Sequence, residues 1–203
     1  MREMTIGAFL ERLASADPTP GGGAAAALAG ALAAALGAMV ARLSAGKGGD
    51  DDAFLRTAQT ADRARDVLLD LTAQDAEAFE AVMRALRLPR ATEEQKQARQ
   101  AAVQAALPRA AEVPLRVMEE TMRVFRLLPD LARTGNPNAV SDVAVGALLA
   151  YAAVHGALHN VRINAAAIKD ATLAAGLQAD AEALGREAAR LRDEVCGALR
   201  ERR

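Results

Sequence analysis

Apolar residues recur every three or four positions along most of the chain, a spacing typical of helices that bury one face. Prolines, glycines and short polar runs interrupt this pattern and mark where the helical segments end. No segment shows the strict apolar and polar alternation of a half-buried strand. The pattern therefore predicts helices over residues 6–13, 21–44, 50–86, 92–107, 115–128, 139–168 and 173–203.

Several boundaries are supported by residues that start or stop helices. The three aspartates 50–52 place negative charge at a helix N-terminus, where the helix dipole favours it. Thr92 and Gln95 have the spacing of a capping box. Pro108 and Pro114 are expected to divide or kink the helix that follows, because proline has no backbone N–H and its ring crowds the preceding turn.

Composition refines this picture of packed helices. Apolar residues make up 52% of the 203 residues but aromatic residues only 2%, so the core must consist mainly of alanine, leucine and valine. Such side chains favour closely packed helices. We predict an all-α fold, a single-domain bundle of about six to eight helices over residues 1–203. Two nearly uncharged helices leave small apolar faces for a symmetric partner, so a homodimer is expected.

Charge and targeting signals exclude some partners. The formal net charge is −1, without the basic excess that binding to a phosphate backbone needs, so no nucleic acid is expected. Residues 18–41 carry no charge, but alanine and glycine dominate them and insert weakly into lipid, which favours a buried helix over a membrane span. Cys196 is the only cysteine and no signal peptide is evident, so we expect a cytoplasmic protein.

One carboxylate interrupts the apolar stripe of the third predicted helix. Asp75 lies between Leu71 and Phe79 on the face that also carries Leu68 and Val82. Burying a carboxylate is costly unless it is paired, hydrogen-bonded or protonated, so such a residue usually has a structural or a catalytic partner. The two alternatives are a buried ion pair with an arginine and a catalytic acid or base.

A second carboxylate, Asp142, lies among valines and leucines in the predicted helix 139–168. The alternative is that Ser141 or Asp142 caps this helix. Further along, the polar run 160–164 contains Asn160, Arg162 and Asn164. Such a run indicates contact either with a ligand or with another helix through hydrogen bonds.

Residues Gly21 to Ala26 match the G-x-G-x-x-A pattern of a dinucleotide fingerprint, but a helix and two prolines precede them instead of a strand, so we reject that interpretation. They still permit close approach of a flat ligand, or else tight helix packing. His155 and His159 lie four residues apart without the glutamate of a zinc motif, so no metal site is expected. No serine triad, phosphate-binding loop or catalytic cysteine signature is visible.

Taken together, several motifs resemble the cyclodeaminase domain of formiminotransferase-cyclodeaminase and the related stand-alone bacterial cyclodeaminases and cyclohydrolases. The similarity covers nearly the whole chain. It is carried by Pro-Thr-Pro-Gly-Gly-Gly at 18–23, Asp-Ala-Glu-Ala-Phe at 75–79, Leu-Pro-Arg at 88–90, Ala-Glu-Val-Pro-Leu at 111–115, Gly-Asn-Pro-Asn-Ala-Val-Ser-Asp at 135–142 and Asn-Val-Arg-Ile-Asn at 160–164. The chain departs from the family after Lys47, where glycines and aspartates replace a more basic segment.

The resemblance implies a helical homodimer that binds a reduced folate. It would either convert 5-formiminotetrahydrofolate to 5,10-methenyltetrahydrofolate with release of ammonia, or hydrolyse 5,10-methenyltetrahydrofolate to 10-formyltetrahydrofolate. No cofactor beyond tetrahydrofolate and no metal is implied. A non-catalytic dimer that binds folate or a protein partner is the alternative.

Within this resemblance, Asp75 and Asp142 are the expected catalytic residues, because partial burial suits a carboxylate to proton transfer near neutral pH. Asn136, Asn138 and Asn164 are expected to hydrogen-bond the pterin edge. Arg162 or Lys47 is expected to bind the benzoyl-glutamate carboxylates, and the glycines at 21–23 to line the cleft. The expected substrate-binding residues are Pro20, Gly21, Gly22, Gly23, Lys47, Asn136, Asn138, Ser141, Arg162 and Asn164.

Overall fold

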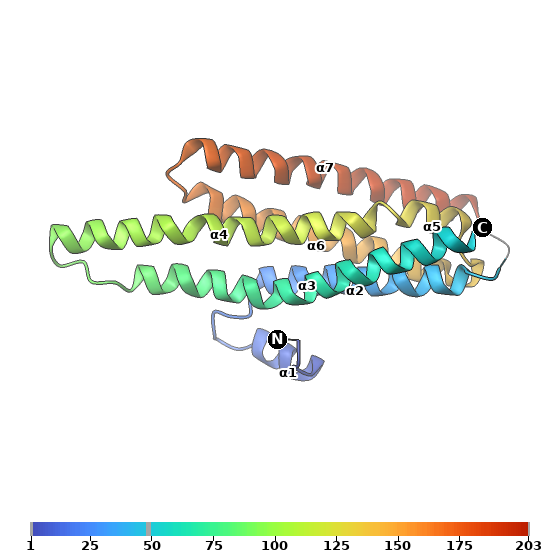
Figure 1. Ribbon diagram of the computed structural model, residues 1–203, viewed down its shortest axis with the longest axis horizontal. Coiled ribbons are helices and arrows are strands. Elements are labelled where there is room, and N and C mark those ends of the chain that lie inside the picture. The colour runs from blue at the N-terminus through green and yellow to red at the C-terminus, as the bar shows by residue number, and fades with distance from the viewer. Residues whose placement is uncertain (1, 48–49, 203) are drawn as a thin grey trace.

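The computed structural model describes residues 2–47 and 50–202, which fold into an elongated helical bundle (Figure 1). No strand occurs in these ranges, so the all-α prediction is confirmed. Gly48 and Gly49, which separate two of the predicted helices, and the last residue of the predicted C-terminal helix lie outside the described residues. The helices are α1 (Ile6–Leu13), α2 (Gly22–Ser44), α3 (Asp51–Leu86), α4 (Glu93–Phe125), α5 (Leu128–Thr134), the 3-10 helix η1 (Pro137–Ala139), α6 (Val140–Ala166) and α7 (Ala171–Glu201).

Capping residues explain where several helices begin. Asp50 accepts a hydrogen bond from the Ala53 N–H at 2.9 Å and so starts α3. Thr92 and Gln95 form the predicted capping box at the start of α4. Each side chain satisfies a backbone N–H that has no partner within the helix, which fixes the boundary locally.

The sequence predicts that Pro108 and Pro114 divide or kink a helix; they do not divide it, because both lie inside the continuous helix α4. The missing N–H of Pro114 frees the carbonyl of Ala110, four residues earlier, from its usual helical partner. That carbonyl instead accepts a hydrogen bond from Asn164 Nδ2 of α6 at 2.7 Å. A side chain from a neighbouring helix thus compensates for the broken backbone bond, and the helix continues.

Helix α2 lies at the centre of the bundle and packs against α3, α4 and α6. Its small residues let the neighbouring helices approach closely: a Cβ at Gly30 would lie 2.5 Å from Thr121 Oγ1 on α4. Larger side chains from α3 and α4 fill the space around it, and Leu68, Met118 and Phe125 are fully buried. Burial of these side chains is the main stabilising contribution to the fold.

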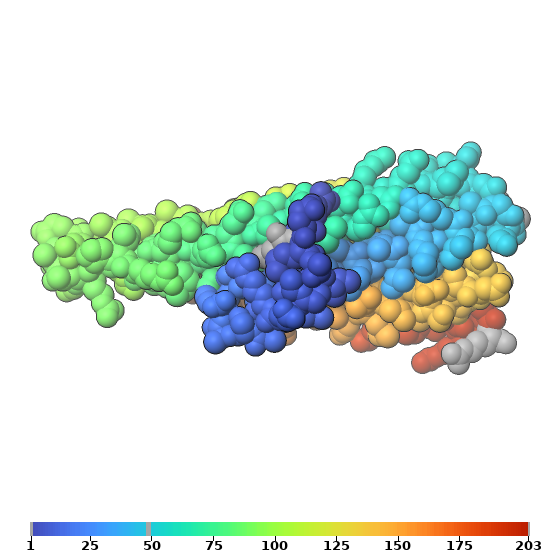
Figure 2. All heavy atoms as spheres, turned by 90° about the horizontal axis from the view of Figure 1, so that it is seen from below, coloured from blue at the N-terminus to red at the C-terminus, as the bar shows by residue number. Residues whose placement is uncertain are grey.

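The hairpin of α3 and α4 projects beyond the other helices, and α1 lies on the outside of the bundle next to it (Figures 1 and 2). α7 covers α6 and α4. The short helix α1 is held by its one buried side chain, Phe9. This arrangement leaves a space between the start of α2, the second half of α3 and the end of α6.

Two segments, α2 and residues 137–166, are long and apolar enough to cross a membrane on length and composition alone. In α2, 61% of the most apolar window is buried, as in the core helix of a globular protein; the value for the second segment is 39%. The exposed apolar side chains of these helices are Leu32, Met39 and Leu43 on α2 and Val145, Leu148 and Ile163 on α6. Exposed apolar side chains that gather on a protein surface usually mark an interaction surface.

Candidate active site

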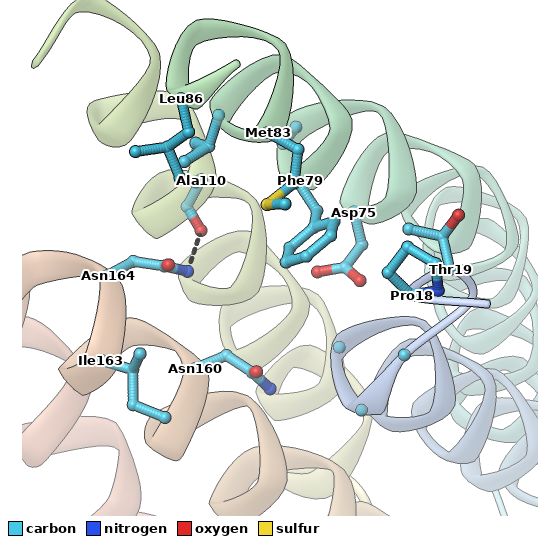
Figure 3. Close-up of a pocket in the computed structure, with 15 residues that line it drawn as sticks. Pro18, Thr19, Asp75, Phe79, Met83, Leu86, Ala110, Asn160, Ile163 and Asn164 are labelled. Carbon is cyan, nitrogen blue, oxygen red and sulfur yellow. Dashed lines mark hydrogen bonds between the residues drawn. The ribbon is translucent and has the colours of Figure 1, made fainter. Parts of the chain in front are cut away.

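A cleft of about 390 Å³ opens where α2 begins, between α3 and α6 (Figure 3). This volume is within the range of about 300–1,000 Å³ that is usual for small-molecule sites. It is lined by Pro18, Thr19, Gly21, Gly22, Gly23, Asp75, Ala78, Phe79, Val82, Met83, Leu86, Ala110, Asn160, Ile163 and Asn164. The structure therefore brings together Asp75, the three glycines and Asn164 from the residues that the sequence predicts for the site.

Among the described residues that line this cleft, Asp75 is the only one with an ionisable side chain. Within residues 2–47 and 50–202 it forms no ion pair, so the buried arginine pair considered from the sequence is not found there. Burial raises the pKa of the Asp75 carboxyl above the usual aspartate value, and a hydrogen bond from the Ala24 backbone N–H partly offsets this increase. A desolvated carboxylate without a counter-ion is suited to bind a cation or to accept a proton.

The glycines at the start of α2 allow this carboxylate to reach its position. A Cβ at Gly23 would overlap the carboxylate of Asp75, whereas a Cβ at Gly22 would meet nothing within 4 Å. Gly23 therefore provides the close approach that the sequence suggested for this motif. The approach also places Asp75 at the N-terminus of α2, where the helix dipole favours negative charge.

Two asparagines lie on the opposite wall of the cleft, one helical turn apart on α6 (Figure 3). Asn164 donates from Nδ2 to the Ala110 carbonyl, and Asn160 donates from Nδ2 to the Gly156 carbonyl at 3.0 Å. The Oδ1 atom of each accepts no hydrogen bond from a described residue. Both oxygens are thus available to a ligand that carries N–H groups along one edge.

The remaining walls are apolar and partly open to solvent. Phe79 and Met83 from α3 and Ile163 from α6 line them, and Phe79 is 40% and Ile163 72% exposed. Phe79 lies one helical turn after Asp75, so its ring is next to the carboxylate (Figure 3). An aromatic face beside a carboxylate and opposite two amides suits a flat, hydrogen-bonding ring system.

The other predicted site residues lie elsewhere in this chain. Asp142 and Asn160 are eighteen residues apart on α6, which corresponds to about 27 Å along the helix. Lys47 and Asn136 line a separate cavity of about 180 Å³ together with Arg202. Three other predicted site residues, Asn138, Ser141 and Asp142, lie in η1 and the first turn of α6, close to Asn136 in the chain.

Hydrogen bonds fix the loop that carries Asn136. Its side chain donates from Nδ2 to the Leu43 carbonyl at 2.9 Å and accepts from the Asn138 N–H through Oδ1 at 3.0 Å. The alternative that Ser141 or Asp142 caps α6 is not found, because the N-cap residue of α6 is Ala139 and the preceding 3-10 helix has Asn136 as its N-cap. Asp142 is therefore not used as a cap, and it lies half-buried in the first turn of α6.

Arg162 and Pro20 also lie outside the lining of the cleft. Arg162 donates from Nε to Glu182 of α7 at 2.7 Å on the surface of the bundle. Pro20 is buried immediately before the glycines. His155 stacks against Tyr151 with ring centroids 4.3 Å apart. No group of three metal-ligating side chains occurs among the residues for which the structure gives positions.

Sequence reasoning did not assign Asn160, Phe79, Met83 or Thr19 to the site. A signal for the first two exists, because Asn160 precedes Asn164 by four residues and Phe79 follows Asp75 by four, so each pair shares a helix face. Thr19 gives no such signal, since its position depends on how the segment before α2 crosses α3.

Comparison with known proteins agrees with this geometry. The profile of the formiminotransferase-cyclodeaminase family matches residues 5–183. The chain belongs to this family. A methenyltetrahydrofolate cyclohydrolase from Methylorubrum extorquens is 39% identical over 194 residues, which cover 94% of this chain and 93% of that protein. The family resemblance seen in the sequence motifs is thus confirmed.

Two further family members show how the domain is used. The formimidoyltransferase-cyclodeaminase of Gallus gallus is 38% identical over 82% of this chain, and the match covers 31% of that longer protein. The crystal structure of formiminotetrahydrofolate cyclodeaminase from Thermotoga maritima superposes with a TM-score of 0.88 at 31% identity, covering 98% of this chain and 97% of the other. The fold is therefore that of this cyclodeaminase structure.

Proposed function

We propose that this family member is a one-carbon folate enzyme and that it hydrolyses 5,10-methenyltetrahydrofolate to 10-formyltetrahydrofolate. The observation that carries the proposal is the unpaired, desolvated Asp75 in a cleft with an aromatic wall and two amides. The full-length similarity to a methenyltetrahydrofolate cyclohydrolase supports it. The methenyl group is part of a cationic amidinium system, so the substrate itself supplies the counter-ion that Asp75 lacks.

In this reaction water attacks the carbon that bridges N5 and N10 of the folate. Asp75 attracts the cationic substrate and accepts a proton from the attacking water, as its raised pKa allows. The C–N5 bond then breaks, and N5 receives the proton that Asp75 took from the water. The hydroxyl on the former bridging carbon loses its proton to solvent as the carbonyl forms, so the formyl group remains on N10 and one proton is released. The Oδ1 atoms of Asn160 and Asn164 bind N–H groups at the pterin edge, and Phe79 lies against its ring.

Cyclodeamination of 5-formiminotetrahydrofolate is the second candidate, because the Thermotoga maritima relative of known structure is named for that activity. Here N10 attacks the cationic formimino carbon and ammonia leaves with a proton. Both reactions need a carboxylate next to a cationic one-carbon unit. The same cleft therefore suits either reaction.

We further propose that the chain acts as a homodimer, formed through the apolar faces of α2 and α6. Val145 and Leu148 are 48% and 58% exposed in the single chain, on helices that carry almost no charge. An antiparallel pairing of these faces would bring Asp142 and Asn136 of one protomer near the cleft of its partner. This arrangement accounts for predicted site residues that lie about 27 Å apart along one α6.

The protein is proposed to need no cofactor other than the folate that carries the one-carbon unit, and to work in the cytoplasm. No nucleic-acid or membrane partner is proposed. These statements rest on the sequence and remain predictions.

The test supplies the purified protein with 5,10-methenyltetrahydrofolate and, separately, with 5-formiminotetrahydrofolate, while methenyl absorbance and free ammonia are followed. Accelerated loss of absorbance from the first substrate identifies a cyclohydrolase. A rise in absorbance together with ammonia from the second identifies a cyclodeaminase. If neither substrate reacts but tetrahydrofolate binds, the chain is a folate-binding module, and both catalytic proposals are wrong.

A further inference from the structure

A second cavity of about 320 Å³ adjoins the cleft. The two share Pro18, Thr19, Phe79 and Met83 in their linings, so one continues into the other. The first cavity has a single ionisable residue, Asp75, whereas the second is rich in charge. A ligand that extends from one to the other would therefore place an uncharged or cationic end near Asp75 and a charged end among the ionisable residues beyond Phe79.

Three arginines line this second cavity. Arg12 lies in the last turn of α1, Arg84 in the last turn of α3, and Arg87 at the C-cap of α3. Among the residues whose positions are given, neither Arg12 nor Arg87 forms an ion pair. The meeting of these two helix ends thus gathers guanidinium groups beside the cleft of a chain whose net charge is slightly negative.

Two carboxylates also belong to this cavity, Asp17 and Glu80. Glu80 lies 3.7 Å from Arg84 in an exposed contact, and its Oε1 accepts the Thr19 hydroxyl at 3.5 Å. An exposed pair of this kind contributes little free energy, so a ligand carboxylate can compete for Arg84 at small cost. The arginines exceed the acids, and the balance favours an anion.

We propose that Arg12, Arg84 and Arg87 form a binding subsite for the carboxylates of the glutamate tail of the folate. This inference rests on the proposed function, because it takes the pterin to lie beside Asp75. The benzoyl ring then passes Phe79, and the α-carboxylate and any γ-linked glutamates reach the guanidinium groups, which bind carboxylates through paired N–H donors. A tail of several glutamates is expected to bind more tightly than a single one.

The family resemblance implied Arg162 or Lys47 for this role. Arg162 is bound to Glu182, and Lys47 lines the small cavity with Asn136. Neither lines the cleft or its continuation. The arginine cavity is the basic group that is continuous with the cleft in this chain.

The test compares wild-type protein with Arg12→Gln/Arg87→Gln, using mono- and triglutamyl forms of 5,10-methenyltetrahydrofolate. Dissociation constants for mono- and triglutamyl tetrahydrofolate are measured in parallel by calorimetry. We expect KM and Kd for the triglutamyl form to rise about tenfold or more in the double variant, as charged hydrogen bonds are lost, with kcat within about twofold of wild type. The Kd of wild type should also rise with salt.

Arg90→Gln is the matched control, because Arg90 is exposed near Arg87 but does not line the cavity. Unchanged KM and Kd in the double variant, or an equal rise in the control, would overturn the subsite. Arg162→Gln tests directly whether Arg162 binds the glutamate tail. A larger rise in KM and Kd for the triglutamyl form in this variant than in the double variant would also overturn the arginine subsite. A wild-type protein that binds both folates without turnover refutes the proposed reaction, while the Kd values still decide the subsite.

Discussion

Asp75 lies in an environment where a cationic substrate can supply the charge interaction that the described residues of the protein do not. Its side chain is half-buried, and the backbone of Ala24 only partly offsets the rise in its pKa that this burial causes. The sequence predicts the burial, because Asp75 lies on an apolar stripe. It does not predict that no described arginine reaches it, since this depends on how α2 and α6 pack against α3.

Replacement of Asp75 by asparagine keeps the shape of the side chain but removes its charge and its basicity. We expect kcat/KM to fall by about 10²- to 10⁴-fold, the usual contribution of a general acid or base. Glu77→Gln serves as the control, because Glu77 lies exposed on the same helix and should keep nearly full activity. Steady-state kinetics on both substrates checks this, and full activity of Asp75→Asn would rule out the carboxylate mechanism.

The raised pKa of Asp75 also predicts how stability depends on pH. Below the usual aspartate pKa the group is protonated in both the folded and the unfolded protein and contributes no difference. As pH rises through the pKa of the folded protein, the unfolded state ionises more readily, so this group lowers the stability of the fold. Wild type should therefore lose stability relative to Asp75→Asn as pH rises from about 4 to the higher pKa of the folded protein.

Thermal unfolding of both proteins in the absence of folate, at several pH values in this range, measures the effect. The difference in Tm between Asp75→Asn and wild type should grow as pH rises and then level off. A difference that stays constant, or that shrinks with rising pH, would show that burial does not raise the pKa of this carboxyl.

At the scale of the helices, α4 shows why local rules locate some boundaries and miss others. The capping box at Thr92 is confirmed because it involves residues within one turn of each other. The proline rule fails at Pro114 because Asn164, fifty residues later in the chain, binds the carbonyl of Ala110 that the proline leaves free. A tertiary contact of this kind has no local signature.

The same contact predicts an energetic coupling between Asn164 and Pro114. Asn164→Ala should destabilise the fold by about 1–2 kcal/mol, because it leaves a carbonyl without a partner. In a Pro114→Ala background the restored N–H can bond to the Ala110 carbonyl, so the same substitution should cost less. Chemical unfolding of the two single variants and the double variant measures this coupling. Additive effects would mean that Asn164 does not compensate for the proline.

For the whole molecule, the sequence predicts the helical class, but only part of the predicted site lies in one cleft. Asp75, Gly23 and Asn164 meet in one cleft, as expected for residues on adjacent helices. The second group, around Asn136 and Asp142, lies at the other end of α6. Motif similarity shows that both groups belong to the family pattern, but it does not state whether one chain or two must supply them.

The proposed homodimer makes this distinction measurable. Wild type should have about twice the 21.1 kDa mass of the chain in solution, and Leu148→Glu should be monomeric, because a charge would be buried in the apolar face. Leu55→Glu is the control, since Leu55 is 47% exposed on α3, outside that face. Sedimentation at several protein concentrations checks both, and a monomeric wild type would contradict the dimer.

Catalytic complementation decides whether the two carboxylates act across the interface. If each site combines Asp75 of one protomer with Asp142 of its partner, Asp75→Asn and Asp142→Asn are each impaired alone. After the two variants are unfolded together and refolded, half of the dimers are mixed, and each mixed dimer has one intact site. Activity should then recover to about a quarter of that of wild type refolded in the same way. Full activity of Asp142→Asn alone, or no recovery in the mixture, would place the chemistry within a single protomer.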